Sequence, residues 1–378
     1  PLLSKTSFMH FLECPIWLWL EKMRPELLPP DDADAKRAMA QGRIVDDLAR
    51  GLYVKGTAIE GFNLVGFKNT QKAIAAGAAV LHQPTAVADG LTARADTLTK
   101  GRGGKWDIHE VKAATKVKPE YISDLAFQRI CFERAGIPIG KTYLVYINNT
   151  YVRKGDVDMK KLMIEEDITK EVEAMMQEVE QQIPEAKKVF SWSKNLDASQ
   201  IMSCPDHGKC GYVGYWLNFL EPKKRETVLR GVDPTMVAKL LEKDAVEVDG
   251  LSSGYLKSIS YRTPEELWPL KIEKQAIKAE LAKLKYPLHF FDYETFSSAI
   301  PAFDGYRPYQ QIPFQFSAIV LDSPDVKPRR FDFLMETFED PALKAIQALR
   351  EAIGPKGSVL AWNASFERGR TEDLAKAH

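Results

Sequence analysis

Two acidic residues and a lysine occur in an order that suits metal-assisted hydrolysis of a phosphodiester bond. Asp96 follows one strand-like run, and Glu110 and Lys112 lie in the next, WDIHEVKAA. Because side chains alternate along a strand, Glu110 and Lys112 share one face. Mg²⁺ and Mn²⁺ prefer carboxylate and water oxygens, so Asp96 and Glu110 could bind either ion while Lys112 positions or deprotonates the attacking water. Taken alone, this pattern is also typical of solvated charges on a hairpin.

The surrounding pattern predicts the elements that would position these side chains. Residues 87–99 contain an Asp-Gly turn signal followed by a strand-like run, and WDIHEVKAA reads as another strand, so the pair predicts an antiparallel hairpin. A helix is predicted from about Pro119 to Ala135, followed by a strand over 141–148. Apolar residues at helical spacing predict another helix over 166–189. The β-β-α-β order predicts an α/β fold that a small nuclease core could use.

Three ordered motifs in this region resemble the RecB-like PD-(D/E)XK nucleases, including those associated with CRISPR systems. ARADTL carries Asp96, WDIHEVKAAT carries Glu110 and Lys112, and DLAFQRICF carries Gln128. The resemblance implies a restriction-endonuclease-like core with Asp96 and Glu110 as metal ligands and Lys112 as the catalytic lysine. Gln128 would orient the active site or contact DNA. LSKTSFMHFLECPIWLWL and INNTYVRKGDVD are similar to a largely uncharacterised bacterial family that joins this module to a C-terminal nuclease-like domain.

The sequence departs from the RecB-like pattern at several positions. Phe132 stands where the helix motif usually has Tyr. The histidine of the usual GxxxH motif is absent, because the chain reads GRIVDD there, and Asp46 is left without a role. His82 or Gln83 occupies the region in which a further Glu is often found. A catalytically silent nucleic-acid-binding domain is therefore an alternative.

Several RecB-like nucleases hold the two ends of the domain together with an iron–sulfur cluster, using one early cysteine and three late ones. Cys14 resembles the early ligand, and Cys204 and Cys210 lie where the late group belongs. The third late cysteine is missing, and His207 could complete a four-ligand site. Thiolates would suit an iron–sulfur cluster or zinc, and a protein without metal at these cysteines is the other alternative. Cys131 is expected to be a simple core thiol.

A second acidic pair marks the start of a different domain. FFDYETF places Asp292 and Glu294 on one face of a predicted strand. This resembles the opening DxE motif of DEDD exonucleases, which belong to the ribonuclease H-like class. LAWNASFERGR resembles the second motif, with Asn363 and with Glu367 in place of the commoner Asp. The resemblance implies a two-metal 3′–5′ exonuclease, and ordinary strand-edge carboxylates are the alternative.

These features divide the chain into three parts. Residues 1–220 are expected to form the RecB-like module, 221–285 a connector of small helices, and 286–378 a ribonuclease H-like domain. The third exonuclease motif does not occur before the chain ends, so we expect that domain to be incomplete at its C-terminus. The chain starts without Met and stops inside a predicted helix, and we therefore expect a fragment of a longer product.

The composition is that of a soluble globular protein of two or three domains, with 378 residues, 45% hydrophobic and 28% charged. Its 52 basic and 52 acidic residues count against a nucleic-acid coat protein, but not against a nuclease whose acidic metal ligands offset basic groove residues. No apolar run reaches the roughly 18 residues of a membrane span, and Phe8–Leu20 lacks a signal-peptide cleavage site. Four cysteines do not make a disulfide framework. We predict a cytoplasmic protein with no membrane partner.

Basic and aromatic residues could contact nucleic acid around the first site. A basic group that flanks this site could contact phosphates or lie solvated in loops; it consists of Lys100, Arg102, Lys105, Lys116 and Lys118. The aromatic residues near the N-terminus could stack on bases, although their spacing favours a core position; they are Phe8, Phe11, Trp17 and Trp19.

Together the patterns predict a metal-dependent deoxyribonuclease that uses Mg²⁺ or Mn²⁺ and acts in DNA repair, recombination or defence. The C-terminal part would add a 3′–5′ exonuclease. The alternatives are a catalytically degenerate nucleic-acid-binding scaffold and an RNA-directed nuclease, so the expected partner is DNA, with RNA as the alternative.

Overall fold

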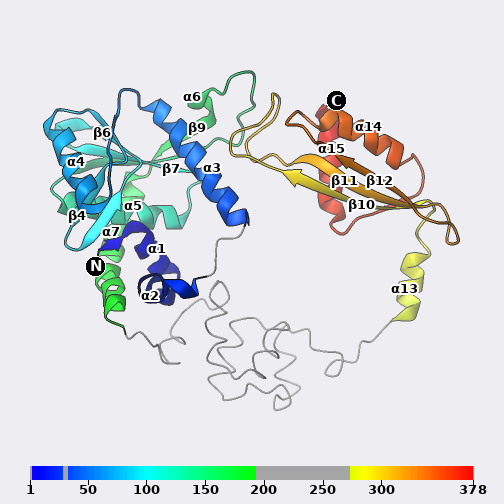
Figure 1. The fold of residues 1–378 in the computed structure, drawn as a ribbon, viewed down its shortest axis with the longest axis horizontal. Helices are drawn as coiled ribbons and strands as arrows, with labels where there is room; N and C mark the ends of the chain where they lie inside the picture. Colours follow the sequence, from blue (N-terminus) through cyan, green and yellow to red (C-terminus); the bar gives the residue numbers. More distant parts are fainter. Residues whose placement is uncertain (1, 29–32, 193–272, 378) are drawn as a thin grey trace, which may run out of the picture. The chain divides into compact units, whose positions relative to one another are not determined.

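The computed structural model describes residues 2–28, 33–192 and 273–377 (Figure 1). The chain divides into two compact units. The first contains the residues up to Tyr146 and resumes at Met163, and the second contains Ile147–Leu162 together with the described C-terminal residues. Each unit combines helices with mixed β-sheet around its own core, so the prediction of an α/β protein is confirmed at this level.

Two sheets form the scaffold of the first unit. The six-stranded sheet has the order β2-β3-β6-β7-β8-β9, and the three-stranded sheet has the order β1-β5-β4. Their bounds are β1 (Leu3–Ser4), β2 (Thr57–Ala58), β3 (Val80–His82), β4 (Thr85–Ala88), β5 (Leu91–Arg94), β6 (Thr97–Lys100), β7 (Trp106–Lys112), β8 (Ile139–Ile147) and β9 (Met163–Asp167).

The helices of the first unit begin where the sequence favours helix starts. Ser4 caps the first helix by accepting a hydrogen bond from the Ser7 backbone N–H at 3.1 Å. Pro15 and Pro119 each lie in the first turn of a helix. Backbone N–H groups in that turn have no partner within the helix, so a proline there costs no hydrogen bond. The helices are α1 (Lys5–Glu13), α2 (Pro15–Met23), α3 (Ala33–Ala49), α4 (Asn63–Ala75), α5 (Pro119–Arg134) and α7 (Thr169–Lys188).

The predicted hairpin is present, but its first strand is divided between the two sheets. β6 pairs antiparallel with β7, with Thr97 opposite His109. β5 pairs with β4 in the other sheet, through a turn in which Asp89 and Gly90 have φ angles of 51° and 74°. Two positive φ angles are the requirement of a tight hairpin turn of this kind. Asp96 therefore lies in the short link between the sheets.

Helix α5 carries the crossover between two parallel strands. β7 and β8 pair in parallel, so the chain must cross from one end of the sheet to the other between them. α5 makes this crossing and packs against α1, α7, β4 and β5. The Phe8 ring of α1 stacks on Phe127 of α5 with centroids 4.8 Å apart, and both side chains are completely buried. This contact fixes the start of α1 relative to α5.

The core interpretation of the N-terminal aromatic residues is confirmed. Phe8 and Trp19 are fully buried, and Phe11 and Trp17 pack against the same core. The burial of Phe8 and Trp19 removes these two rings as a surface for stacking bases, and Phe11 and Trp17 are partly buried.

The second unit contains a four-stranded sheet with the order β12-β11-β10-β13. β10, β11 and β12 are antiparallel neighbours, whereas β13 pairs in parallel with β10. The sequence predicts three of these strands and misses β12. The elements are α6 (Met159–Leu162), α13 (Lys274–Leu281), β10 (Leu288–Phe296), β11 (Ile312–Leu321), β12 (Arg329–Leu334), α14 (Ala342–Ala352), β13 (Ser358–Leu360) and α15 (Ala364–Ala377).

Residues 147–162 group with the second unit, although the sequence assigns them to the first. The reason is a set of hydrogen bonds to the loop after β10. Arg153 Nη1 donates to the carbonyl groups of Pro301 and Ala302 at 2.9 and 2.8 Å. The backbone N–H of Gly155 donates to the Asp304 carboxylate at 2.9 Å.

Most of the predicted connector, residues 221–285, lies outside the described residues, and α13 belongs to its described part. Within the described ranges, no helix has the length and apolar character needed to cross a membrane.

Phe8→Ala is expected to lower the free energy of unfolding of the first unit by about 3–5 kcal/mol, because it removes a fully buried ring and leaves a cavity. Guanidinium denaturation measures the change. Leu64→Ala is the matched control, since Leu64 is 59% exposed. A loss below about 1 kcal/mol for Phe8→Ala would contradict the packing of α1 on α5.

Candidate active site

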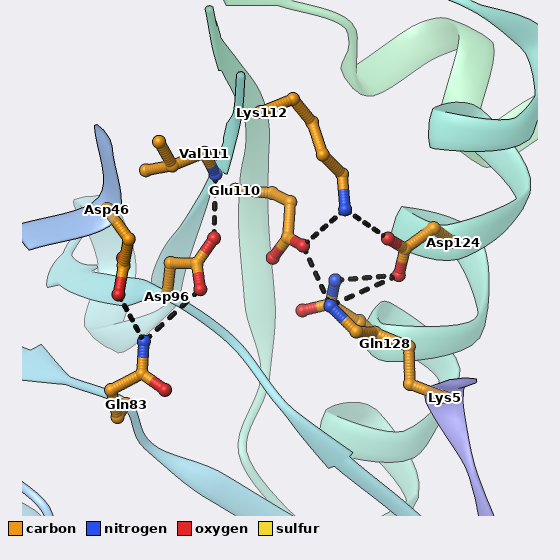
Figure 2. A network of polar contacts seen from close by, with 9 residues as sticks. All are labelled: Lys5, Asp46, Gln83, Asp96, Glu110, Val111, Lys112, Asp124 and Gln128. Atoms are coloured by element: carbon orange, nitrogen blue, oxygen red, sulfur yellow. Dashed lines mark hydrogen bonds and ion pairs between the residues drawn. The ribbon is translucent and has the colours of Figure 1, made fainter. Parts of the chain in front are cut away.

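The structure brings together the three residues that carry the first motif (Figure 2). The backbone N–H of Val111 donates to Asp96 Oδ2 at 2.8 Å and fixes this carboxylate beside β7. Glu110 and Lys112 lie on one face of β7, with Lys112 Nζ 2.8 Å from Glu110 Oε1. The carboxylates of Asp96 and Glu110 are neighbours in this arrangement, as Figure 2 shows.

Two residues that the sequence analysis did not identify complete this group. Lys5 Nζ donates to Glu110 Oε1 at 2.7 Å, and Lys112 Nζ donates to Asp124 Oδ2 at 2.6 Å. Lys5 also lies 3.5 Å from Asp124 Oδ1. Two ammonium groups thus alternate with two carboxylates at the junction of α1, β7 and α5 (Figure 2).

The Glu110 carboxylate carries its charge in a buried position. Its residue is 1% exposed. Burial alone would disfavour the charged form, but the adjacent Lys112 and Lys5 hold the pKa of Glu110 well below its usual range. The second carboxylate oxygen, Oε2, is buried and makes no hydrogen bond within the described part of the chain. A buried anionic oxygen without a partner is unfavourable, and a cation beside it would remove that cost.

The pKa of the Asp96 carboxylate is shifted in the opposite direction from that of Glu110. Burial, followed by the negative charge of Glu110, raises the pKa of Asp96 to about 7. Two carboxylates at close range resist simultaneous ionisation, and a divalent cation between them would favour the charged form of both. This arrangement fits Mg²⁺ or Mn²⁺ on the chemistry of the donor atoms.

No set of three or more His, Cys, Asp or Glu residues in the described ranges is arranged to hold a metal ion. Mg²⁺ does not need such a set, because it often retains several waters and binds through one or two carboxylates and the phosphate of a substrate. Asp96 and Glu110 are therefore sufficient as protein ligands for that mode of binding.

Asp46 and Gln83 lie on the other side of Asp96. Gln83 Nε2 donates to Asp96 Oδ1 at 3.2 Å and to Asp46 Oδ2 at 3.3 Å. Arg50 Nη2 donates to Asp46 Oδ2 at 2.8 Å, whereas Asp46 Oδ1 is buried without a hydrogen-bond partner among the described residues. The spacing of GRIVD, with Asp46 in the place of the motif histidine, is the signal that could have identified this residue.

Gln128 contacts another side chain of the site and not the solvent. Its side chain is completely buried, and Nε2 donates to Asp124 Oδ1 at 3.0 Å. Asp124 lies one helical turn earlier on α5, so the two side chains share a face. The arrangement favours the orienting role over direct contact with DNA, because no part of Gln128 is accessible.

The cysteines are described only in part. Cys131 is fully buried on α5, and burial raises the pKa of its thiol to about 12; the prediction of a core thiol is confirmed. Cys14 is buried between α1 and α2. Cys204, His207 and Cys210 lie outside the described residues, so an iron–sulfur or zinc site there stays a prediction.

The predicted basic group is divided between two ends of the sheet. β6 and β7 are antiparallel, with Lys100 opposite Trp106. Lys100, Arg102 and Lys105 therefore lie around the closed end of the hairpin, whereas Asp96 and Lys112 lie at its open end. The prediction that these three residues flank the site is wrong, because the register places them at the far end of the strands.

The second acidic pair lies on an exposed face of its sheet. Asp292 and Glu294 are exposed and alternate along β10 with buried Phe291 and Tyr293. Glu367 on α15 is buried in a cavity of about 410 Å³ that Phe291 also lines. The structure therefore does not bring Glu367 together with the pair, since it lies on the opposite face of β10.

Residues 289–378 match the model of a family described as a domain of unknown function, DUF2779. No curated protein matches the chain. Among solved structures, a chain described as the crystal structure of SSO0001 aligns with 16% sequence identity and a TM-score of 0.27, over 55% of this chain and 84% of that one.

Asp96→Asn is expected to stabilise the metal-free protein at pH 8 by up to about 4 kcal/mol. The folded-state pKa of Asp96 is raised from 3.8 to about 7, so the stability of the wild type falls as pH rises through that interval, while the variant has no carboxylate to ionise. Thermal unfolding in EDTA between pH 4 and 8 measures the difference. Equal pH dependence of the two proteins would show that Asp96 is not buried against a charged Glu110.

Proposed function

We propose that the first unit is a metal-dependent deoxyribonuclease with its active site at Asp96, Glu110 and Lys112. The observation that carries the proposal is a pair of adjacent carboxylates: Asp96 is partly buried and has a raised pKa, and Glu110 is buried and has an unpartnered oxygen. Such a pair is unfavourable in an isolated protein and becomes favourable when a divalent cation binds.

The protein groups have distinct roles in this proposal. Asp96 and Glu110 would hold Mg²⁺ or Mn²⁺, which when bound activates water and offsets charge on the phosphate. Neighbouring Glu110 and Asp124 hold the pKa of Lys112 well above its usual value despite burial. The charged Lys112 ammonium is therefore placed to donate hydrogen bonds to the attacking water or the phosphate.

Asp124 and Gln128 support this lysine. Asp124 Oδ2 accepts from Lys112 Nζ at 2.6 Å, and Gln128 holds Asp124 through its other oxygen. Since these partners come from one helix, α5 sets the direction of the lysine side chain. Both residues are positioning residues, because neither faces the space between the two metal-binding carboxylates.

A scaffold without catalytic activity is the second candidate. Lys5 and Lys112 balance the charges of Glu110 and Asp124 through ion pairs. In that arrangement, Oε1 of Glu110 has hydrogen-bond donors without any metal, as expected for a site that has lost its catalytic metal. The unpartnered Oε2 of the same carboxylate and the raised pKa of Asp96 favour the enzyme.

For the second unit we propose a ribonuclease H-like exonuclease domain. β13 runs parallel to β10 and pairs with its first part, Leu288–Phe290. The chain that leaves β13 and carries Asn363 therefore continues toward the part of β10 in which Asp292 and Glu294 lie. This arrangement supports a polar site beside β10, with Asp292 and Glu294 as its ligands and without Glu367.

Lys112→Ala is expected to reduce cleavage of end-labelled DNA in Mn²⁺ or Mg²⁺ by at least about a hundredfold, since the loss of one hydrogen-bond donor that stabilises a transition state costs on that order. Lys105→Ala is the matched control because Lys105 is exposed at the closed end of the β6–β7 hairpin, away from the site. Both variants are compared with wild type on single-stranded and duplex DNA and on RNA.

Loss of activity with Lys112→Ala alone would support the proposed site. Full activity of Lys112→Ala would contradict it. Absence of cleavage by the wild type, with DNA binding intact, would favour the scaffold, and faster cleavage of RNA would replace the deoxyribonuclease assignment.

Asp292→Ala tests the second unit separately. We expect it to remove stepwise shortening from the 3′ end while leaving the cleavage that depends on Lys112. Single-nucleotide resolution of the products distinguishes the two activities. Unchanged shortening in Asp292→Ala would contradict an exonuclease site on β10.

A further inference from the structure

A cavity of about 370 Å³ opens beside the proposed catalytic carboxylates. Asp96 lines one end of it, and Lys5 lines the wall formed by the start of α1. Residues of α4, β4 and β5 complete the cavity. Whatever occupies this space would therefore lie directly against the site of hydrolysis. Its volume is in the lower part of the range for small-molecule sites, which suits a ligand of the size of one nucleotide.

The outer part of the cavity pairs a cation with an aromatic ring. Phe62 and Arg94 both line it, and the Arg94 guanidinium carbon lies 4.6 Å from the centroid of the Phe62 ring. Phe62 is 68% exposed. An arginine beside an exposed ring can contact a phosphate while the ring stacks on a base, and these are the two interactions that single-stranded nucleic acids require.

The backbone holds Phe62 in this exposed position. Gly61 and Asn63 have φ angles of 87° and 50°, so the chain bends sharply on both sides of the ring before α4 begins. The positive φ of Gly61 is readily adopted only by glycine. Asn63 Oδ1 accepts a hydrogen bond from Thr92 Oγ1 at 3.3 Å, which ties the bend to β5.

The remaining walls are rigid. The Thr85 backbone N–H donates to Thr70 Oγ1 at 2.9 Å, and Thr70 Oγ1 donates to the Gly66 carbonyl group at 2.9 Å. A Cβ on Gly66 would lie 2.7 Å from Thr85 Oγ1, so α4 packs closely on β4 at this point. The cavity is consequently formed before any ligand binds.

We propose that this cavity binds one unpaired nucleotide of a single DNA strand, next to the phosphate that is cleaved. Phe62 stacks on its base, and Arg94 contacts the adjoining phosphate. The inference rests on the proposed function, because the position of the cleaved phosphate follows from Asp96 and Glu110.

The proposal gives the enzyme a preference for unpaired strands. A base in a duplex is stacked between its neighbours and must leave the helix to enter such a cavity, which is unfavourable. Single-stranded ends and flaps meet no such cost. The cavity thus selects the form of DNA, while Asp96, Glu110 and Lys112 perform the hydrolysis.

Binding in EDTA tests the cavity without hydrolysis. Fluorescence anisotropy at fixed salt compares fluorescein-labelled oligo(dT) with a blunt duplex. We expect Phe62→Ala to weaken binding of oligo(dT) about tenfold, Phe62→Trp to restore it, and duplex binding to stay unchanged. Arg94→Gln should weaken the same complex and reduce its salt dependence. Leu64→Ala is the matched control, because Leu64 is exposed on the same helix and does not line the cavity.

An abasic residue moved along the oligonucleotide identifies the base that stacks on Phe62. Wild type should lose affinity at one position, and Phe62→Ala should show no further loss there, since both changes remove the same contact. Wild-type affinity in Phe62→Ala, an equal loss on single strand and duplex, or tighter binding of oligo(U) than of oligo(dT) would overturn the inference.

The binding results that test the cavity can be told apart from the cleavage results that test the proposed function. Normal binding by Phe62→Ala together with metal-dependent cleavage that requires Lys112 would refute the cavity and leave the proposed function intact. Specific loss of single-strand binding in Phe62→Ala, with no cleavage by wild type in any metal, would refute hydrolysis and support the cavity.

Discussion

Glu110 is negatively charged inside the first unit because two ammonium groups lie against one of its oxygens. Lys5 and Lys112 approach Oε1 at 2.7 and 2.8 Å, and the other oxygen is buried without a hydrogen bond in the described chain. Three elements must meet for this to occur, because Lys5 starts α1, Glu110 and Lys112 belong to β7, and Asp124 belongs to α5. The stacking of Phe8 on Phe127 holds α1 against α5 and so brings Lys5 and Asp124 to this buried charge.

The same charge sets the properties of Asp96. A charged Glu110 nearby makes ionisation of Asp96 unfavourable and raises its pKa to about 7. Asp96 lies in the link between two sheets, held by the Val111 N–H and by Gln83. The link therefore places the Asp96 carboxylate beside the charged Glu110 and against the cavity that Asp96 lines. In the proposed function, a divalent cation binds between the two carboxylates and a nucleotide binds in the cavity.

Local sequence predicted the parts of this site that lie within one motif. The alternation of β7 placed Glu110 and Lys112 on one face, and α5 was predicted to within a residue of its observed end. Asp124 could have been found from its position one turn before Gln128. Lys5 could not, because its place depends on the parallel pairing of Leu3 and Ser4 with β5, a contact between segments distant in sequence. The prediction that Glu367 joins Asp292 and Glu294 is wrong for a similar reason, since the packing of α15 places Glu367 on the other face of β10.

The most direct test of the account is a crystal structure of the protein soaked in Mn²⁺, with the metal located by anomalous scattering. The account predicts a peak between the carboxylates of Asp96 and Glu110, with Oε2 of Glu110 as a ligand and with Lys5 and Lys112 still bonded to Oε1. A soaked crystal with Mn²⁺ bound elsewhere, or with no peak between these carboxylates, would contradict the central claim that Asp96 and Glu110 form a metal site.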